Sequence, residues 1–174
     1  MLIFETERLI VREFISADMD YFFMINSNEM VMRFIRKALT KKESDDFFKA
    51  NLLLYKEHPK LGRWCVLEKK HNRFIGSFVL IHLPFEDEKT AIQLGYALLP
   101  EAWGKGYATE LTKAGIEYFF TNNFSSELHA ITAMQNIASQ KVLLKCGFVA
   151  NGTKKDKEET VQRYILKRKM LHKE

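Results

Sequence analysis

The chain has 174 residues, and this length predicts one domain, residues 1–174, around a single hydrophobic core. Hydrophobic residues make up 47% of the chain and charged residues 28%, a balance that excludes intrinsic disorder. The formal net charge is +5, and +4 of it falls on residues 101–174, which carry 12 basic and 8 acidic side chains. We therefore expect an anionic partner for the second half of the chain.

The sequence also bears on compartment and metal content. It has no apolar run long enough to cross a membrane, and residues 1–5 do not resemble the start of a signal peptide. The two cysteines, Cys65 and Cys146, are far apart and fit no metal or redox spacing. We expect a cytoplasmic protein that binds no membrane and holds no metal.

The first sixty residues are predicted to form one strand and two helices. Residues 8–14 are rich in β-branched side chains, which favours a strand. Ser16 is the expected N-cap of a helix with an acidic first turn. Thr40 and Glu43 have the spacing of a capping box, and Pro59 marks the end of the helix that follows.

The middle of the chain has the pattern of extended strands. Residues 64–67 and 74–81 flank a turn at His71-Asn72 and predict a hairpin. Residues 91–99 predict a third strand, with Ile92, Leu94, Tyr96 and Leu98 on one face.

The last third alternates between helices and strands. Apolar side chains recur at helical spacing over residues 108–121, and residues 128–134 favour a strand. Residues 137–146 predict a short helix that Gly147 ends, and residues 160–170 alternate as a closing strand. The order predicts an α/β (α+β) protein with a mixed sheet, because a doubly wound sheet would need strict alternation of strands and helices.

The junction at residues 98–109 carries the strongest local signal for chemistry. Gly104 and Gly106 flank Lys105 and open an amphipathic helix. Free N–H groups and the dipole at a helix N-terminus, with glycines that allow close approach, predict a cradle for a phosphate. A Walker loop needs Ser or Thr directly after its lysine, and a dinucleotide fingerprint needs glycine at Thr109, so neither motif is present. The alternative is a tight strand–helix turn that binds nothing.

A second segment, residues 136–148, combines a cap, a short helix and a glycine stop. Asn136 stands where an N-cap belongs, and Ser139 lies in the first turn. Lys141 and Lys145 share one face of the helix. Taken alone, these residues describe a capped surface helix.

With these two segments the sequence resembles the GNAT superfamily of N-acetyltransferases and, within it, the RimJ/RimL-like branch. The resemblance covers nearly the whole chain, beginning at residues 5–12 and continuing through residues 73–77. It is most specific at residues 103–110, which resemble the family's pyrophosphate-binding motif, and at residues 136–148. The family implies a central mixed sheet with a splayed pair of parallel strands, flanked by helices, and acetyl-CoA-dependent N-acetyltransferase activity.

The resemblance also implies where acetyl-CoA, the co-substrate, would lie. Its pantetheine would run along residues 95–99, and its pyrophosphate would rest on the N–H groups of residues 104–109. The implied binding residues are Leu98, Leu99, Trp103, Gly104, Lys105, Gly106, Tyr107, Ala108, Thr109, Asn136, Ser139, Lys141 and Lys145.

The implied chemistry is direct transfer of acetyl from a thioester to an amine. Many GNAT enzymes protonate the departing thiolate with a tyrosine seven residues after the helix asparagine, but Leu143 stands there in this chain. The catalytic candidates are Ser139 for the thiolate, Asn136 to orient the pantetheine or the amine, and Glu158 as general base. Alternative bases are Glu159, Glu68, Glu5 and Glu7.

Several functions stay open on the sequence alone. We expect a primary amine as acceptor, foremost the α-amine of a protein or peptide N-terminus. A small amine (polyamine, aminoglycoside or amino-acid derivative) is the alternative, which the acidic residues 86–88 would favour if they lined the site. Leu143 also permits a non-catalytic acyl-CoA-binding module. No block of five Lys or Arg residues occurs, so we expect no nucleic-acid partner, and a homodimer remains an open alternative.

Overall fold

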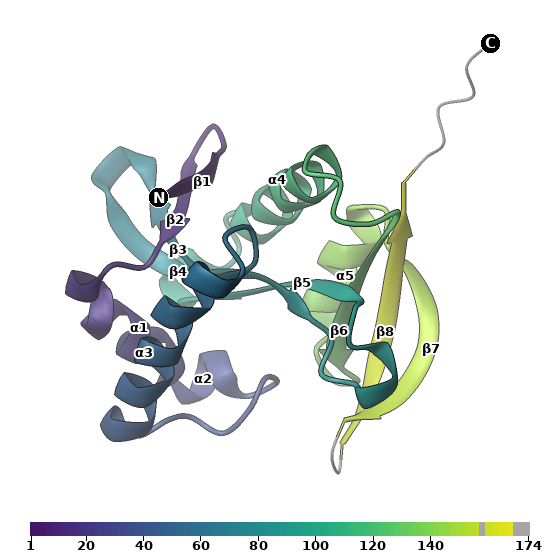
Figure 1. Ribbon diagram of the computed structural model, residues 1–174, viewed down its shortest axis with the longest axis horizontal. Coiled ribbons are helices and arrows are strands. Elements are labelled where there is room, and N and C mark those ends of the chain that lie inside the picture. The colour runs from purple at the N-terminus through teal and green to yellow at the C-terminus, as the bar shows by residue number, and fades with distance from the viewer. Residues whose placement is uncertain (157–158, 169–174) are drawn as a thin grey trace.

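One mixed β-sheet organises the chain, with helices on both of its faces (Figure 1). The computed structural model describes residues 1–156 and 159–168, without the side chain of Asp156. The strands are β1 Leu2–Glu5, β2 Leu9–Glu13, β3 Gly62–Glu68, β4 Arg73–His82, β5 Ile92–Leu98, β6 Glu127–Ala133, β7 Val149–Asp156 and β8 Glu159–Lys167. The α-helices are α1 Met19–Asn26, α2 Glu29–Met32, α3 Lys41–Glu57, α4 Tyr107–Thr121 and α5 Ile137–Lys145.

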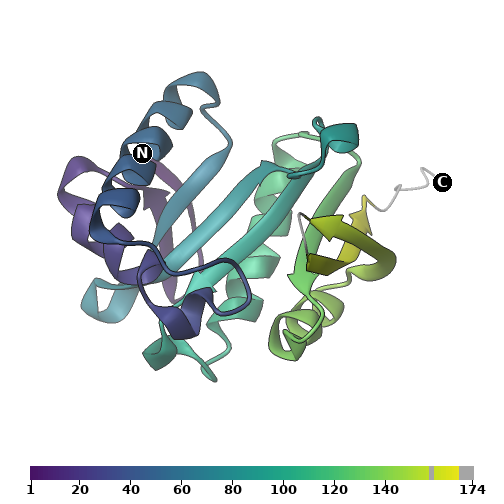
Figure 2. The same cartoon turned by 90° about the horizontal axis from the view of Figure 1, so that it is seen from below.

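The sheet has the order β1-β2-β3-β4-β5-β6-β8-β7, and its only parallel pair among the described residues is β5 with β6. That pair is joined in register at a single position, Gln93 opposite His129. By contrast, β4 pairs with the full length of β5 on its other side. From Leu94 onward β5 and β6 therefore diverge, as Figure 2 shows, and one edge of β5 carries backbone groups that β6 does not bind.

The helices divide the apolar core into two layers. Helices α1 and α3 pack on one face of the sheet, around Phe14, Phe22 and Phe48, which are all buried. Helix α4 packs on the other face, over Trp64 and Phe78. This second contact is unusually close, because a Cβ atom at Gly115 of α4 would lie 2.3 Å from the Phe78 ring.

Most of the predicted elements are confirmed, including the mixed α/β class. The capping box is present, since Thr40 Oγ1 accepts from the Glu43 N–H and the Glu43 carboxylate accepts from the Thr40 N–H. Ser16 is not the N-cap of α1: it opens a 3₁₀ turn, Ser16–Asp18, and the N-cap is Asp18. The Asp18 carboxylate explains why the helix begins later, because it accepts from the Ile15 N–H and pairs with the Arg12 guanidinium at 2.5 Å.

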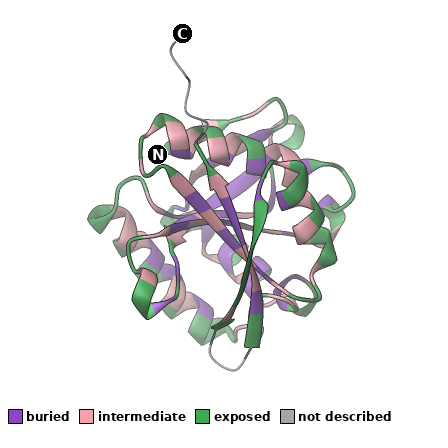
Figure 3. Ribbon diagram, turned by 90° about the vertical axis from the view of Figure 1, so that its right-hand side faces the viewer, coloured by how far each residue is buried: buried purple, intermediate pink, exposed green. Residues whose placement is uncertain are grey.

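Three elements lay outside the predicted set. Strand β1 and helix α2 have only 4 residues each, too few to show a period. Strand β7 carries the polar run Asn151 to Lys155 and lies at the edge of the sheet, where Figure 3 shows it exposed along most of its length. In the described part of the chain, no helix is both long and apolar enough to cross a membrane.

Candidate active site

The N-terminus of α4 presents an uncovered row of backbone donors. Gly104 and Gly106 have positive φ angles of 72° and 81°, a conformation that glycine adopts without strain. The Glu110 N–H is the first to bond back, to the Gly106 carbonyl, and no described group accepts from the N–H groups of residues 104–109. Added at Gly104, a Cβ atom would meet nothing within 4 Å. The loop thus fits a pyrophosphate that approaches the backbone directly.

The rear of this loop is braced by an ion pair from the other end of the chain. Arg8 pairs with Glu110 at 2.6 Å, donates to the Lys105 carbonyl at 3.0 Å and lies 4.5 Å above the Tyr107 ring. Burial disfavours the Glu110 carboxylate, but hydrogen bonds from Thr6 and Arg8 outweigh it and lower the pKa of this group. These contacts hold the loop in place and leave its backbone N–H groups free.

The diverging strands bring two hydroxyl groups together. Tyr96 lies on β5 beyond the last paired position, and its hydroxyl is 3.5 Å from Ser139 Oγ on α5. At this long spacing, both groups can also donate to a third atom placed between them. Burial raises the pKa of Tyr96 and outweighs the opposing hydrogen bond to Ser139, so the phenol stays protonated at neutral pH.

Strand β6 carries a further polar group on the same face of the sheet. Tyr96 on β5 and Thr132 on β6 each lie three residues beyond the paired Gln93 and His129, and so have the same alternation of sides. The Thr132 hydroxyl is buried and has no hydrogen-bond partner in the described residues. An unsatisfied buried hydroxyl fits a site whose ligand supplies the missing partner.

Asn136 and the lysines occupy the positions expected on α5. Asn136 is the N-cap, its Oδ1 accepting from the Ser139 N–H at 3.2 Å, which fixes the first turn that carries Ser139. Lys141 and Lys145 are both exposed. Cys146 lies at the end of α5, with Sγ 3.8 Å from the Thr109 carbonyl oxygen, so α5 ends against the first turn of α4.

The remaining predicted binding residues divide into exposed and buried groups. Trp103, Lys105 and the two loop glycines are exposed. Leu98, Leu99 and Tyr107 are buried in the core, so only their backbone can face a ligand. Ala108 and Thr109 are half-buried in the first turn of α4. Leu143, seven residues after Asn136, is also a core residue.

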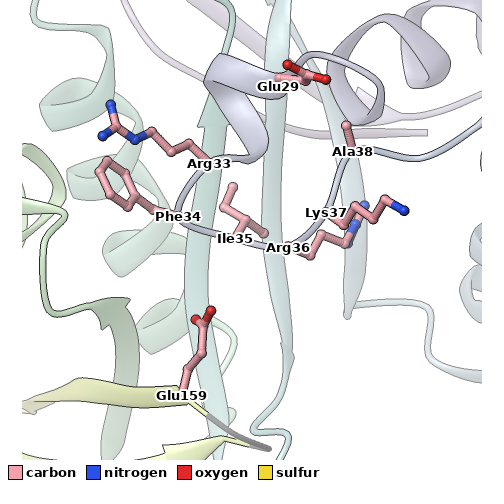
Figure 4. Close-up of a pocket in the computed structure, with 8 residues that line it drawn as sticks. All are labelled: Glu29, Arg33, Phe34, Ile35, Arg36, Lys37, Ala38 and Glu159. Carbon is pink, nitrogen blue, oxygen red and sulfur yellow. The ribbon is translucent and has the colours of Figure 1, made fainter.

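A pocket lies on the opposite face of the sheet, between the segment after α2 and the start of β8 (Figure 4). It has a volume of about 390 Å³. Arg33 and Phe34 extend to one side of the segment and Arg36 and Lys37 to the other, while Glu159 faces it from β8 (Figure 4). The lining residues are Glu29, Arg33, Phe34, Ile35, Arg36, Lys37, Ala38 and Glu159.

The structure separates the candidate bases. Glu158 lies outside the described residues, whereas Glu159 lines the pocket. Glu68 accepts from the Tyr107 hydroxyl at 2.8 Å, and that bond, followed by one from His71, lowers the pKa of Glu68 and weakens it as a base. Glu5 pairs with Lys69 at 2.5 Å, and Glu7 is exposed near the N-terminus.

The acidic residues 86–88 do not form a free acidic surface. Asp87 and Glu88 both pair with Lys154 at 2.6 Å, and Glu88 also pairs with Arg163 at 2.5 Å. These ion pairs connect the β4–β5 loop to β7 and β8. They leave little negative charge to attract a polycation.

Tyr96 is the residue that sequence patterns missed. Its side chain counts as part of an apolar strand face, and nothing local distinguishes it from Leu94 or Leu98. The one feature that could have indicated a functional role is that Tyr96 places a hydroxyl on the strand along which the pantetheine was expected to lie. Its meaning depends on the position of α5, which no spacing along the chain reveals.

The fold has the features that the sequence resemblance implies for a GNAT transferase: a mixed sheet with one splayed parallel pair, and a helix that begins with free N–H groups. The family model described as "Acetyltransferase (GNAT) domain" matches residues 8–149. The chain belongs to this family and is an N-acetyltransferase.

Relatives and solved structures agree with this assignment. An uncharacterized N-acetyltransferase, YoaA of Bacillus subtilis, is 28% identical over 152 residues, covering 86% of this chain and 84% of the relative. The spermidine N(1)-acetyltransferase of Vibrio cholerae is 23% identical over 147 residues, covering 83% of this chain and 81% of the relative. The structure of RimL, a ribosomal L7/L12 α-N-protein acetyltransferase in complex with coenzyme A, superposes with a TM-score of 0.80 at 16% identity, covering 96% of this chain and 98% of that one.

Proposed function

We propose that this chain transfers acetyl from acetyl-CoA directly to a primary amine, and that the acceptor is the α-amine of a protein or peptide N-terminus. One observation carries the proposal: β5 and β6 separate after Gln93 and His129, and the Tyr96 and Ser139 hydroxyls meet beside the opening. The α4 loop, with its free N–H groups, supplies the phosphate site at one end of this opening.

The roles of the residues follow from the charges that develop during transfer. The thioester supplies an electrophilic carbonyl carbon, which the amine lone pair attacks before the carbon–sulfur bond breaks. The Tyr96 hydroxyl, kept neutral by burial, donates toward the oxygen or sulfur that becomes negative. Ser139 donates a hydrogen bond to the departing thiolate, directly or through water, and the thiolate finally takes a proton from solvent. Asn136 holds Ser139 in position by capping its helix.

The amine must lose a proton, and we propose Glu158 as the base that receives it. Its neighbour Glu159 lines the pocket on the acceptor side, where a base would have to act. Replacing Glu158 by Gln should lower kcat/KM about 100-fold at pH 7 and less at high pH, where more of the amine is already neutral. Glu159→Gln is the matched control and should lower it less than about 3-fold. Equal losses in both variants would contradict the assignment of Glu158.

The acceptor preference rests on the charge around the pocket. Arg33, Arg36 and Lys37 outnumber the carboxylates of Glu29 and Glu159, so the lining repels a polycation more than it attracts one. This disfavours polyamines and aminoglycosides, although a relative of similar coverage is named for spermidine. The RimL structure, named for the α-amine of a ribosomal protein, supports the N-terminal acceptor.

Two substitutions at the opening test the proposal. Ser139→Ala should lower kcat about 100-fold, and Tyr96→Phe about 10-fold, because each removes one donor aimed at developing charge. The dissociation constant of acetyl-CoA, measured by calorimetry, should stay within about 2-fold in both variants. Tyr118→Phe, which removes a partly buried hydroxyl on α4, serves as the control and should keep wild-type kcat. Unchanged kcat in Ser139→Ala, or parallel losses of affinity and kcat, would overturn the assigned roles.

A further inference from the structure

Among the described residues, Arg33, Arg36 and Arg63 on the acceptor face have no carboxylate partner, and two of them, Arg36 and Arg63, contact the same aromatic ring. Four other arginines form ion pairs with acidic side chains: Arg8 with Glu110, Arg12 with Asp18, Arg73 with Glu68, and Arg163 with Glu88. Within the described residues, by contrast, no carboxylate oxygen lies within 4.0 Å of the guanidinium of Arg36 or Arg63.

These two arginines share one aromatic ring. The Arg36 guanidinium lies 4.8 Å from the centroid of the Phe47 ring and that of Arg63 lies 4.9 Å from it, so they are within about 10 Å of each other. Arg36 also donates to the Asn26 amide oxygen, which fixes its direction. Two like charges are thus held close together by an aromatic ring and an amide, without an anion of the chain between them.

Their surroundings make an added anion favourable. Burial, and to a smaller extent the nearby charge of Arg36, lower the pKa of Arg63 to about 10. Burial also lowers the pKa of the Arg36 guanidinium, although much of the residue faces solvent. A cation that has lost part of its hydration and has no counter-ion gains strongly from an incoming carboxylate.

Position connects the pair to the reaction. Arg63 on β3, Val79 on β4 and Gly95 on β5 stand opposite one another in one row across the sheet. Side chains at directly opposite positions share a face, and this is the face that α1 and α3 cover. Gly95 belongs to the splayed part of β5, and Arg36 lines the pocket. The phosphate-binding loop is on the α4 side, so the two arginines are not placed to bind the nucleotide.

We propose that Arg36 and Arg63 bind a carboxylate of the amine acceptor, so that the preferred substrates are peptides with an acidic residue close to the acetylated N-terminus. This deepens the proposed function and rests on it. Strands lie about 4.8 Å apart, which puts the Arg63 backbone about 10 Å from Gly95. An extended peptide spans this distance in about three residues. The acidic side chain therefore belongs to one of the first few positions of the acceptor.

The test compares matched acceptors with matched variants. Two peptides differ only in carrying Asp-Glu or Asn-Gln after the first residue, and free glutamate and aspartate form a third arm. Arg36→Met and Arg63→Met remove the charge and keep an unbranched side chain. Arg168→Met makes the same change at the far end of β8, where Arg168 binds Asn123. Thermal melts confirm that each variant is folded.

For the wild type, kcat/KM should be about 10-fold or more higher with the acidic peptide than with its amide counterpart. Each of Arg36→Met and Arg63→Met should lower kcat/KM for the acidic peptide by about 10-fold and for the amide peptide by less than about 2-fold. The KM of acetyl-CoA should not change, and Arg168→Met should behave as wild type. Preference for the free amino acids over the acidic peptide would overturn the peptide assignment. Equal losses with both peptides, or no acidic preference in the wild type, would overturn the proposal itself.

A binding measurement keeps this inference separate from the proposed function. Calorimetry of the CoA-loaded protein measures the affinity for each peptide without turnover, and so tests the contribution of the arginine pair to binding. Tight binding of the acidic peptide, lost in Arg63→Met, supports the pair even if no acetyl is transferred, and that result would count against the proposed function alone. Transfer at equal rates to both peptides, with equal binding, would count against the pair alone.

Discussion

The two binding regions that we propose for this enzyme are built from different atoms. At the α4 loop the chain presents backbone N–H groups, held from behind by Arg8 and Glu110, and its two glycines keep side chains out of the way. At the proposed acceptor pocket it presents side chains, among them Arg33, Arg36 and Lys37. Backbone donors suit a ligand that never changes, whereas side chains allow the acceptor to be chosen by substitution.

The largest effect on this comparison should come from Gly104→Ala. The new methyl group would enter the space in front of the loop, and alanine at a φ of 72° is strained. We expect acetyl-CoA affinity to fall about 30-fold, with the KM of the acceptor unchanged, measured by calorimetry and two-substrate kinetics.

Gly152→Ala is a matched control for this change. Gly152 has a φ of 75° and also faces open space, but it lies on β7. Both variants should lose about 1 kcal/mol of unfolding free energy from strain. An equal loss of acetyl-CoA affinity in both would show that strain alone is responsible and that the loop is not the phosphate site.

A smaller effect should follow from Asp18→Asn on the acceptor side. Burial disfavours the Asp18 carboxylate, but hydrogen bonds from Arg12 and Ile15 outweigh it, so the pKa of Asp18 lies below its usual 3.8. A lowered folded-state pKa means that the group stabilises the protein above about pH 4 and loses this contribution as pH falls through the folded value. Denaturant unfolding at pH 7 should show Asp18→Asn about 1.5 kcal/mol less stable. The difference in unfolding free energy between wild type and Asp18→Asn should shrink toward pH 3. A difference that grows at low pH would contradict a lowered pKa for Asp18.

The smallest effect should come from loosening the brace behind the loop. Glu110→Gln keeps the shape of the side chain but removes the charge that binds Arg8, so the loop should become less ordered. We expect acetyl-CoA affinity to fall about 5-fold, with kcat nearly unchanged. Glu117→Gln, an exposed position on the same helix, controls for the change of net charge. Identical affinities in the two variants would show that the brace does not shape the loop.

The same contrast explains what the sequence could predict. The loop glycines, the Asn136 cap and the Thr40–Glu43 box act within a few residues, so spacing alone locates them. Tyr96 and Ser139, which lie 43 positions apart in the chain, meet only because β5 and β6 diverge. Arg36 and Arg63 likewise depend on Phe47 and on strand register. Long-range contacts of this kind leave no local periodicity, so the sequence could not predict which of these side chains meet.

Acetyl transfer itself is the most direct test of the central claim. The wild-type protein is incubated with acetyl-CoA and a panel of N-terminal peptides, polyamines and aminoglycosides, thiol release is followed, and mass spectrometry locates the acetyl group. We predict thiol release with peptides, the acetyl group on the N-terminal α-amine, and near-complete loss of both in Ser139→Ala. Thiol release no faster than in buffer with every amine, from a folded protein that binds acetyl-CoA, would contradict the account.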